Sequence, residues 1–122
     1  MNIKQKVLVV DDDSCTREIL LLILQNAGYE VTVLADHHLD FKKNNDFPDL
    51  ILLDYNLGLK KGSELCQELK AAEDTSHIPV ILISAIEDLK LIASESCADD
   101  FIAKPFSMQQ LLGKIENALS IK

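Results

Sequence analysis

The sequence has no tryptophan, little aromatic content of any kind (5%), and no excess of positive charge. Its 20 acidic residues outnumber its 12 lysines and arginines, which gives a net charge of −8. A chain this acidic is repelled by nucleic-acid phosphates and by anionic lipid headgroups. We therefore expect no direct binding to nucleic acid and no docking on a membrane.

Cysteine is also scarce and scattered. Cys15, Cys66 and Cys97 show no C-x-x-C spacing, so neither a zinc site nor a redox pair is indicated. We interpret them as free, buried or half-buried thiols of a cytoplasmic protein. No apolar run approaches the roughly 18 residues that a membrane span needs. Only four glycines and three prolines interrupt the chain, so we expect one domain over residues 1–122, without linkers.

Five short apolar runs recur along the chain, and a helical pattern follows each of them. Three of the runs are almost continuously apolar, which is typical of parallel strands buried on both faces. The pattern predicts an α/β fold: a doubly wound, five-stranded parallel sheet of flavodoxin-like order 2-1-3-4-5 with helices on both faces. The second run alternates and suits an edge. The runs are Lys6–Val10, Glu30–Leu34, Asp49–Leu53, Val80–Ile83 and Asp100–Ala103.

The expected helices carry recognisable end signals. Asp13 or Ser14 can cap the first helix and Gly28 can end it, while Ser107 and Gln110 have capping-box spacing at the start of the last. The second helix is poorly marked. The expected ranges are Ser14–Ala27, a segment within Asp36–Asn44, Ser63–Ala72, Ile86–Glu95 and a helix that begins at Ser107.

Charged residues follow the strands at the point where ligands bind in such sheets. Asp11-Asp12-Asp13 follows the first run, Asp54 the third and Lys104 the fifth. Carboxylates brought together are unfavourable unless a cation neutralises them. One divalent ion and Lys104 would balance Asp11, Asp12 and Asp54, and an all-oxygen ligand set favours Mg²⁺. We interpret Asp13 as a helix cap. Three aspartates in this loop disfavour a flavin phosphate site.

Four short motifs lie at the ends of the expected strands. They are Val9-Val10-Asp11-Asp12, Asp49-Leu50-Ile51-Leu52-Leu53-Asp54, Ile83-Ser84-Ala85, and Ala98-Asp99-Asp100-Phe101-Ile102-Ala103-Lys104-Pro105-Phe106. Each motif is weak alone. Together, in this order, they resemble the receiver domain of two-component response regulators over essentially the whole chain.

The resemblance implies a role for each matching residue. Asp54 would be the phosphoacceptor, and Lys104 would reach the phosphoryl oxygens. Asp11, Asp12 and Asp54 would hold Mg²⁺ together with the backbone carbonyl of Asn56. A carboxylate can attack phosphorus to give an acyl phosphate, and the metal offsets the charge of an anionic donor.

Two further residues match the family's conformational switch. Ser84 would hydrogen-bond a phosphoryl oxygen, and Phe101 would change rotamer to fill the space that Ser84 leaves. Pro105 would follow a cis peptide bond that directs Lys104 into the site.

The resemblance also implies partners. A sensor histidine kinase or a histidine phosphotransfer protein would donate to Asp54. A downstream protein would read the helix 4–strand 5–helix 5 surface, about Ile86 to Leu119, and a homodimer formed on activation is left open. The domain would assist its own phosphorylation and dephosphorylation and would not be an enzyme acting on other substrates.

Two alternatives remain. One is a pseudo-receiver interaction module that works without phosphorylation. The other is a Mg²⁺-dependent aspartyl phosphatase, whose aspartate spacing Asp11 and Asp13 match, although we find no cap domain or loop for a substrate. Gly58, Lys60 and Lys61 depart from the family pattern. We expect a looser loop at Gly58 and interpret the two lysines as a solvated basic patch.

Overall fold

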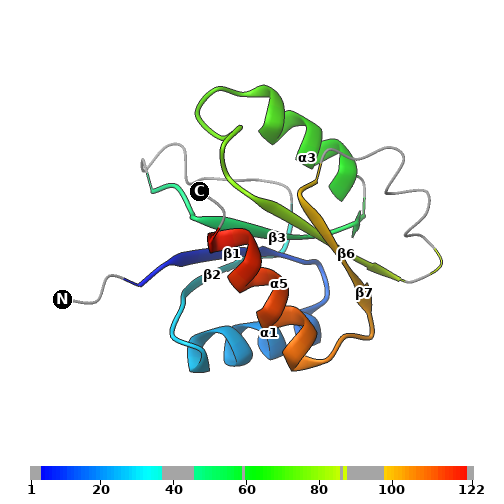
Figure 1. Ribbon diagram of the computed structural model, residues 1–122. Coiled ribbons are helices and arrows are strands. Elements are labelled where there is room, and N and C mark those ends of the chain that lie inside the picture. Colours follow the sequence, from blue (N-terminus) through cyan, green and yellow to red (C-terminus); the bar gives the residue numbers. More distant parts are fainter. Residues whose placement is uncertain (1–3, 37–45, 59, 86, 88–97, 121–122) are drawn as a thin grey trace.

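The computed structural model describes residues 4–36, 46–58, 60–85, 87 and 98–120 (Figure 1). The expected helices within Asp36–Asn44 and Ile86–Glu95 lie almost entirely outside these ranges. The elements are β1 Lys6–Val10, α1 Ser14–Asn26, β2 Glu30–Leu34, β3 Leu50–Asp54, β4 Asn56–Leu57, β5 Lys60–Lys61, α3 Gly62–Ala71, β6 Val80–Ala85, β7 Asp100–Lys104 and α5 Met108–Ser120.

Five strands form one parallel sheet in the order β2-β1-β3-β6-β7. Because β6 and β7 are the fourth and fifth of these strands, the predicted order 2-1-3-4-5 is confirmed, with β2 at an edge as expected. A small antiparallel hairpin, β4–β5, follows β3 and was not predicted. Two-residue strands carry no readable hydrophobic period, so sequence reasoning missed it.

Helices cover both faces of the sheet: α1 and α5 lie against one face and α3 against the other (Figure 1). Successive side chains of a strand point to opposite faces, so each strand supplies both halves of the core. Val7 and Val9 pack with the α1 and α5 side chains, whereas Leu8 and Val10 pack with those of α3. This two-sided burial explains why the central strands are continuously apolar.

The helix ends follow the predicted signals. Asp13 is the N-cap of α1, where its carboxylate accepts a hydrogen bond from the Thr16 backbone N–H. Gly28 ends this helix with a φ of 97°, which a glycine adopts at little cost. At α5 the Ser107 hydroxyl accepts from the Gln110 backbone N–H, and the Gln110 side chain accepts from the Ser107 backbone N–H, both at 3.0 Å.

The cysteines differ in their exposure to solvent. Cys66 is buried, but Cys15 is exposed on α1, so the expectation of burial is wrong for Cys15, whereas Cys97 lies outside the described residues. The position of Cys15 in the first, solvent-facing turn of the helix explains the difference.

None of the helices in the described part of the chain has the length and apolar character needed to cross a bilayer.

The capping box at α5 generates a stability prediction. Ser107→Ala removes the acceptor of the Gln110 N–H and should lower the free energy of unfolding by about 1 kcal/mol, measured by urea denaturation. Ser120→Ala is the control, because that hydroxyl only donates to the exposed Asn117 carbonyl near the other helix end. Equal effects of the two substitutions would contradict a capping role for Ser107.

Candidate functional site

The strands of the sheet end together at one edge, and four of them place polar side chains there. Asp11 follows β1, Asp54 ends β3, and Ser84 and Lys104 lie at the ends of β6 and β7. The parallel register pairs Asp54 with Ile83 and Ala85 with Lys104, so residues far apart in the sequence become neighbours. A cleft of about 270 Å³, here called the strand-tip cleft, opens at this edge. Its lining residues are Asp12, Asp13, Asp54, Tyr55, Asn56, Ser84, Ala85 and Lys104.

Three carboxylates converge at the cleft. Ligand oxygens of Asp11, Asp12 and Asp54 lie within 4.8 Å of one another. Asp11 and Asp54 are 1% and 6% exposed, whereas Asp12 is open to solvent. The Asp11 side chain is oriented by the Asp13 backbone N–H, which donates to it at 2.9 Å. The donor atoms are all oxygens and one ligand is accessible, so these residues fit a hard divalent cation such as Mg²⁺.

Lys104 reaches both buried carboxylates. Its Nζ lies 3.3 Å from Asp54 Oδ1 and 3.4 Å from Asp11 Oδ2. The Lys104–Pro105 peptide bond is cis, as expected. Burial disfavours the charged ammonium, but the two carboxylates outweigh it and raise the pKa of Lys104 above its usual 10.5. The lysine is therefore a permanent positive charge between the two aspartates.

Asp54 has the most perturbed environment of these groups. Burial, followed by repulsion from Asp11, raises the pKa of its carboxyl from 3.8 to about 6. Attraction to Lys104 and a hydrogen bond from the Asn56 backbone N–H offset only part of this shift. A lone lysine thus leaves the carboxylate pair undercompensated, which is the condition that a bound cation would relieve.

Of the two predicted switch residues, Ser84 lines the strand-tip cleft and Phe101 is not among its lining residues. Ser84 is buried, and its hydroxyl donates to the Ala85 carbonyl at 3.2 Å. Phe101 is half-buried and packs against the hydrophobic cluster on the α3 side of the sheet. Ser84 thus lies in the cleft that holds Asp54, whereas Phe101 lies farther back on β7, paired with Leu82 of β6.

The family model of the response regulator receiver domain matches residues 7–116. The chain belongs to the response regulator receiver family. The DNA-binding response regulator MtrA of Mycobacterium tuberculosis is 33% identical over 119 residues, in a match that covers 95% of this chain and 51% of MtrA. The chain spans about half the length of the curated relatives that it matches first.

Solved receiver structures share the fold closely. The receiver domain of NtrX from Brucella abortus superposes with a TM-score of 0.85 at 31% identity, covering 95% of this chain and 99% of that one. The receiver domain of the sensor histidine kinase PA1611 from Pseudomonas aeruginosa also gives 0.85, covering 97% and 99%. That structure has a magnesium ion coordinated in its active-site cleft, and at 24% identity its likeness shows the fold alone.

The lysines beside the receiver's cleft are not a free basic patch. Lys60 forms an ion pair with Glu68 of α3, and the Lys61 ammonium lies 5.7 Å from the centroid of the Tyr55 ring. The interpretation of a solvated patch is therefore wrong for Lys60, because the β4–β5 hairpin brings it against α3. Gly58 connects the two hairpin strands with a φ of 71°, which favours glycine there.

Gly62 is a positioning residue that sequence reasoning missed. A Cβ at this position would lie 2.3 Å from the Asp54 carbonyl oxygen and 3.0 Å from the Tyr55 Cα. The Gly62 N–H donates to the Tyr55 carbonyl, so α3 begins in direct contact with the chain around the proposed phosphoacceptor. The sequence signal, one glycine after two lysines, does not reveal this contact because the partner lies on another element.

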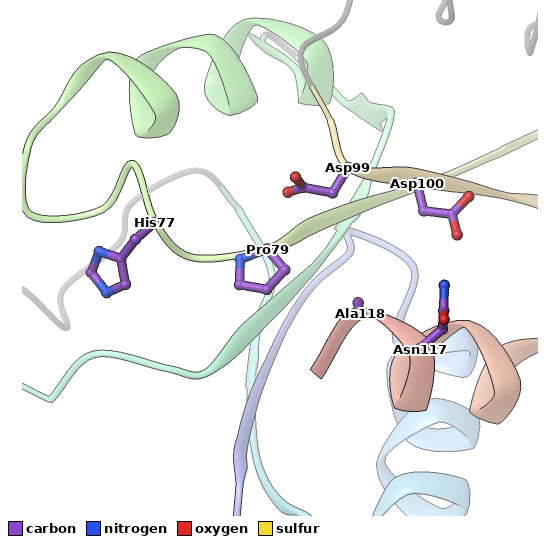
Figure 2. A pocket seen from close by; sticks show the side chains of 6 residues that line it. All are labelled: His77, Pro79, Asp99, Asp100, Asn117 and Ala118. Carbon is purple, nitrogen blue, oxygen red and sulfur yellow. The ribbon is translucent and has the colours of Figure 1, made fainter. Parts of the chain in front are cut away.

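A second cavity, of about 230 Å³, lies at the opposite end of the sheet, where β6 and β7 begin (Figure 2). Its carboxylates already have partners: Asp99 pairs with Lys70 and Asp100 with Lys114, each at 2.8 Å. It shares no residue with the strand-tip cleft, so we assign it no part in the site. Its lining residues are His77, Pro79, Asp99, Asp100, Asn117 and Ala118.

The raised pKa of Asp54 predicts a pH-dependent stability of the metal-free protein. The folded chain binds this proton more tightly than the unfolded chain, so the stabilisation is complete below pH 3.8 and is lost as pH rises through about 6. The loss should be at most about 3 kcal/mol. Urea unfolding in a chelator across this range would measure it. In Asp54→Asn the free energy of unfolding should lose the part of its pH dependence that Asp54 causes. Identical pH profiles of the two proteins would contradict a raised pKa of Asp54.

The close contact at Gly62 predicts a steric defect. Gly62→Ala should lower the free energy of unfolding by about 1–3 kcal/mol, because backbone atoms have to move to admit the methyl group. Gly113→Ala is the matched control, since nothing lies within 4 Å of its added Cβ and alanine favours the helix by roughly 0.5–1 kcal/mol. Denaturation midpoints that shift in the same direction for both variants would refute the contact.

Proposed function

We propose that this receiver accepts a phosphoryl group on Asp54 from the phosphohistidine of a sensor histidine kinase or a histidine phosphotransfer protein. The observation that carries the proposal is the placement of the buried Asp54 carboxylate, 3.3 Å from Lys104, in an open cleft beside Asp11. The arrangement offers a nucleophile, a fixed positive charge for the incoming oxygens and access for a donor.

The transfer step uses the chain's own groups. A carboxylate oxygen of Asp54 forms a bond to phosphorus while the phosphorus–nitrogen bond of the donor breaks. The electron pair of that bond goes to the departing histidine nitrogen. Lys104 is placed to contact the phosphoryl oxygens and to balance the charge that they bring. Asp11, Asp12, Asp54 and the backbone carbonyl of Asn56 would hold Mg²⁺, which would supply further charge neutralisation when bound.

Phosphorylation would act through a change of surface. The Ser84 hydroxyl would leave the Ala85 carbonyl and donate to a phosphoryl oxygen, and Phe101 would move toward the vacated space. The response would pass through β7 to α5 and to the segment from Ile86 to Glu95, which lies almost entirely outside the described residues. A downstream protein, or a second copy of the chain, would recognise this surface.

Partners and location follow from the same proposal. α1 starts directly beside the acidic cluster and exposes Ile19 and Leu22, 54% and 62% accessible, which suits the docking of a phosphodonor protein.

MtrA is named as DNA-binding, but this chain spans about half of it. Because the net charge is −8, we expect no nucleic-acid contact from this domain, and we place the domain in the cytoplasm with its partners.

The pseudo-receiver remains the competing function. A pseudo-receiver needs no nucleophile and no metal site, so the convergence of Asp11, Asp12, Asp54 and Lys104 argues against it.

The proposed receiver would also assist the hydrolysis of its own acyl phosphate and would have no other substrate, so we do not regard it as an enzyme.

Incubation with acetyl phosphate and Mg²⁺ tests the proposal directly. Mass spectrometry of the intact chain should show the addition of one phosphoryl group, which disappears in Asp54→Asn and when Mg²⁺ is chelated. An unmodified wild-type chain would favour the pseudo-receiver, and a label that persists in Asp54→Asn would place the phosphoacceptor elsewhere.

Lys104 has its own expected effect on the rate. Lys104→Ala should slow labelling by about a hundredfold, the usual cost of removing one preorganised charge from a transition state. Lys114→Ala is the control, because that lysine pairs with Asp100 away from the cleft and should leave the rate unchanged. Equal labelling rates for the two variants would show that Lys104 takes no part in the transfer.

A further inference from the structure

The Tyr55 hydroxyl is a buried polar group without a hydrogen-bond partner among the described residues. The residue follows the proposed phosphoacceptor directly and is only 8% exposed. Buried hydroxyls are nearly always paired, since an unpaired one loses its bonds to water without replacement. The unpaired hydroxyl is therefore a donor that is available to a new acceptor at the site beside it.

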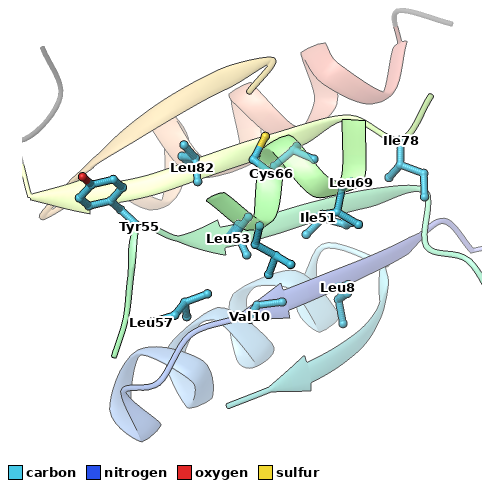
Figure 3. Packing of buried hydrophobic residues seen from close by; sticks show 12 residues of the cluster. Leu8, Val10, Ile51, Leu53, Tyr55, Leu57, Cys66, Leu69, Ile78 and Leu82 are labelled. Atoms are coloured by element: carbon cyan, nitrogen blue, oxygen red, sulfur yellow. The ribbon is translucent and has the colours of Figure 1, made fainter. Parts of the chain in front are cut away.

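The side chain of Tyr55 bridges the hydrophobic cluster and the strand-tip cleft. Its ring belongs to the cluster on the α3 side of the sheet, against which Phe101 also packs. Figure 3 shows the ring reaching from the end of β3 toward the end of β6, with the hydroxyl at the tip farthest from Leu53. Tyr55 also lines the strand-tip cleft together with Ser84 and Ala85.

The nearby end of β6 holds a hydrogen bond that the proposed function would break. The Tyr55 backbone N–H donates to the Ile83 carbonyl at 2.9 Å, which fixes Tyr55 against this strand. Two residues later the Ala85 carbonyl accepts its bond from the Ser84 hydroxyl. When Ser84 turns to a phosphoryl oxygen, the Ala85 carbonyl loses this donor while the Tyr55 hydroxyl remains unpaired.

We propose that Tyr55 is a positioning residue that exchanges hydrogen bonds with Ser84: its hydroxyl donates to the Ala85 carbonyl once Ser84 has turned to the phosphoryl group. The inference rests on the proposed function of Asp54 and Ser84. In the wild-type chain the unpaired hydroxyl and the released carbonyl would then satisfy each other.

The exchange predicts a difference between two backgrounds in the unmodified protein. Tyr55→Phe should leave stability unchanged or raise it in the wild-type chain, because the lost hydroxyl had no partner. In Ser84→Ala the Ala85 carbonyl is already released, so the same substitution should lower the folding equilibrium constant by about fivefold, the usual effect of one hydrogen bond. Urea denaturation measures both; an equal effect of Tyr55→Phe in the two backgrounds would overturn the proposal.

Binding of a phosphoryl mimic gives the second test. Beryllofluoride with Mg²⁺ should bind Tyr55→Phe about fivefold more weakly than wild type. Tyr29→Phe is the matched control, since Tyr29 packs with the cluster on the α1 and α5 side and should leave the affinity unchanged. Equal affinities of Tyr55→Phe and wild type would overturn the exchange. Failure of the wild-type chain to bind the mimic would count against the proposed function, and the denaturation comparison would still decide the role of Tyr55.

Discussion

The repulsion between two buried carboxylates, Asp11 and Asp54, is the constraint on which the site depends. Burial of Asp54 and repulsion from Asp11 raise the pKa of the Asp54 carboxyl to about 6. Lys104, which lies beside both carboxylates, offsets only part of this rise. The protein therefore maintains a local charge imbalance. A divalent cation, or a proton, would relieve it, so metal binding and acidity would be linked at the residue that we propose as the phosphoacceptor.

The rest of the fold makes this imbalance tolerable. Leu50 to Leu53 are completely buried between helices on both faces, and this rigid strand ends at Asp54. The Gly62 contact fixes the chain immediately after it, and the Asp13 backbone N–H orients Asp11. These contacts hold the carboxylates in place, and the burial of the surrounding side chains offsets the cost of keeping them together.

The site also contains two polar groups that, under the proposed function, would find better partners once Asp54 is modified. The Ser84 hydroxyl makes one bond, at 3.2 Å, within its own strand, and the Tyr55 hydroxyl makes none among the described residues. A phosphoryl group brings acceptor oxygens to the donors beside it. In this view the free energy of phosphorylation would be coupled to the end of β6 and to the aromatic packing around Phe101, because the new acceptors bias a structure with alternative pairings.

Local sequence patterns are enough to predict the alternation of strands and helices, the caps at Asp13 and Ser107, and which residues stand at the strand ends. These features depend on local periodicity and on short-range hydrogen bonds, which neighbouring residues encode. The folded chain was needed to reveal the 3.3 Å approach of Lys104 to Asp54, the ion pair of Lys60 with Glu68, and the contacts of Gly62 and Tyr55. Each of these joins elements distant along the chain, and their separation is set by sheet register and helix packing, which no local pattern records.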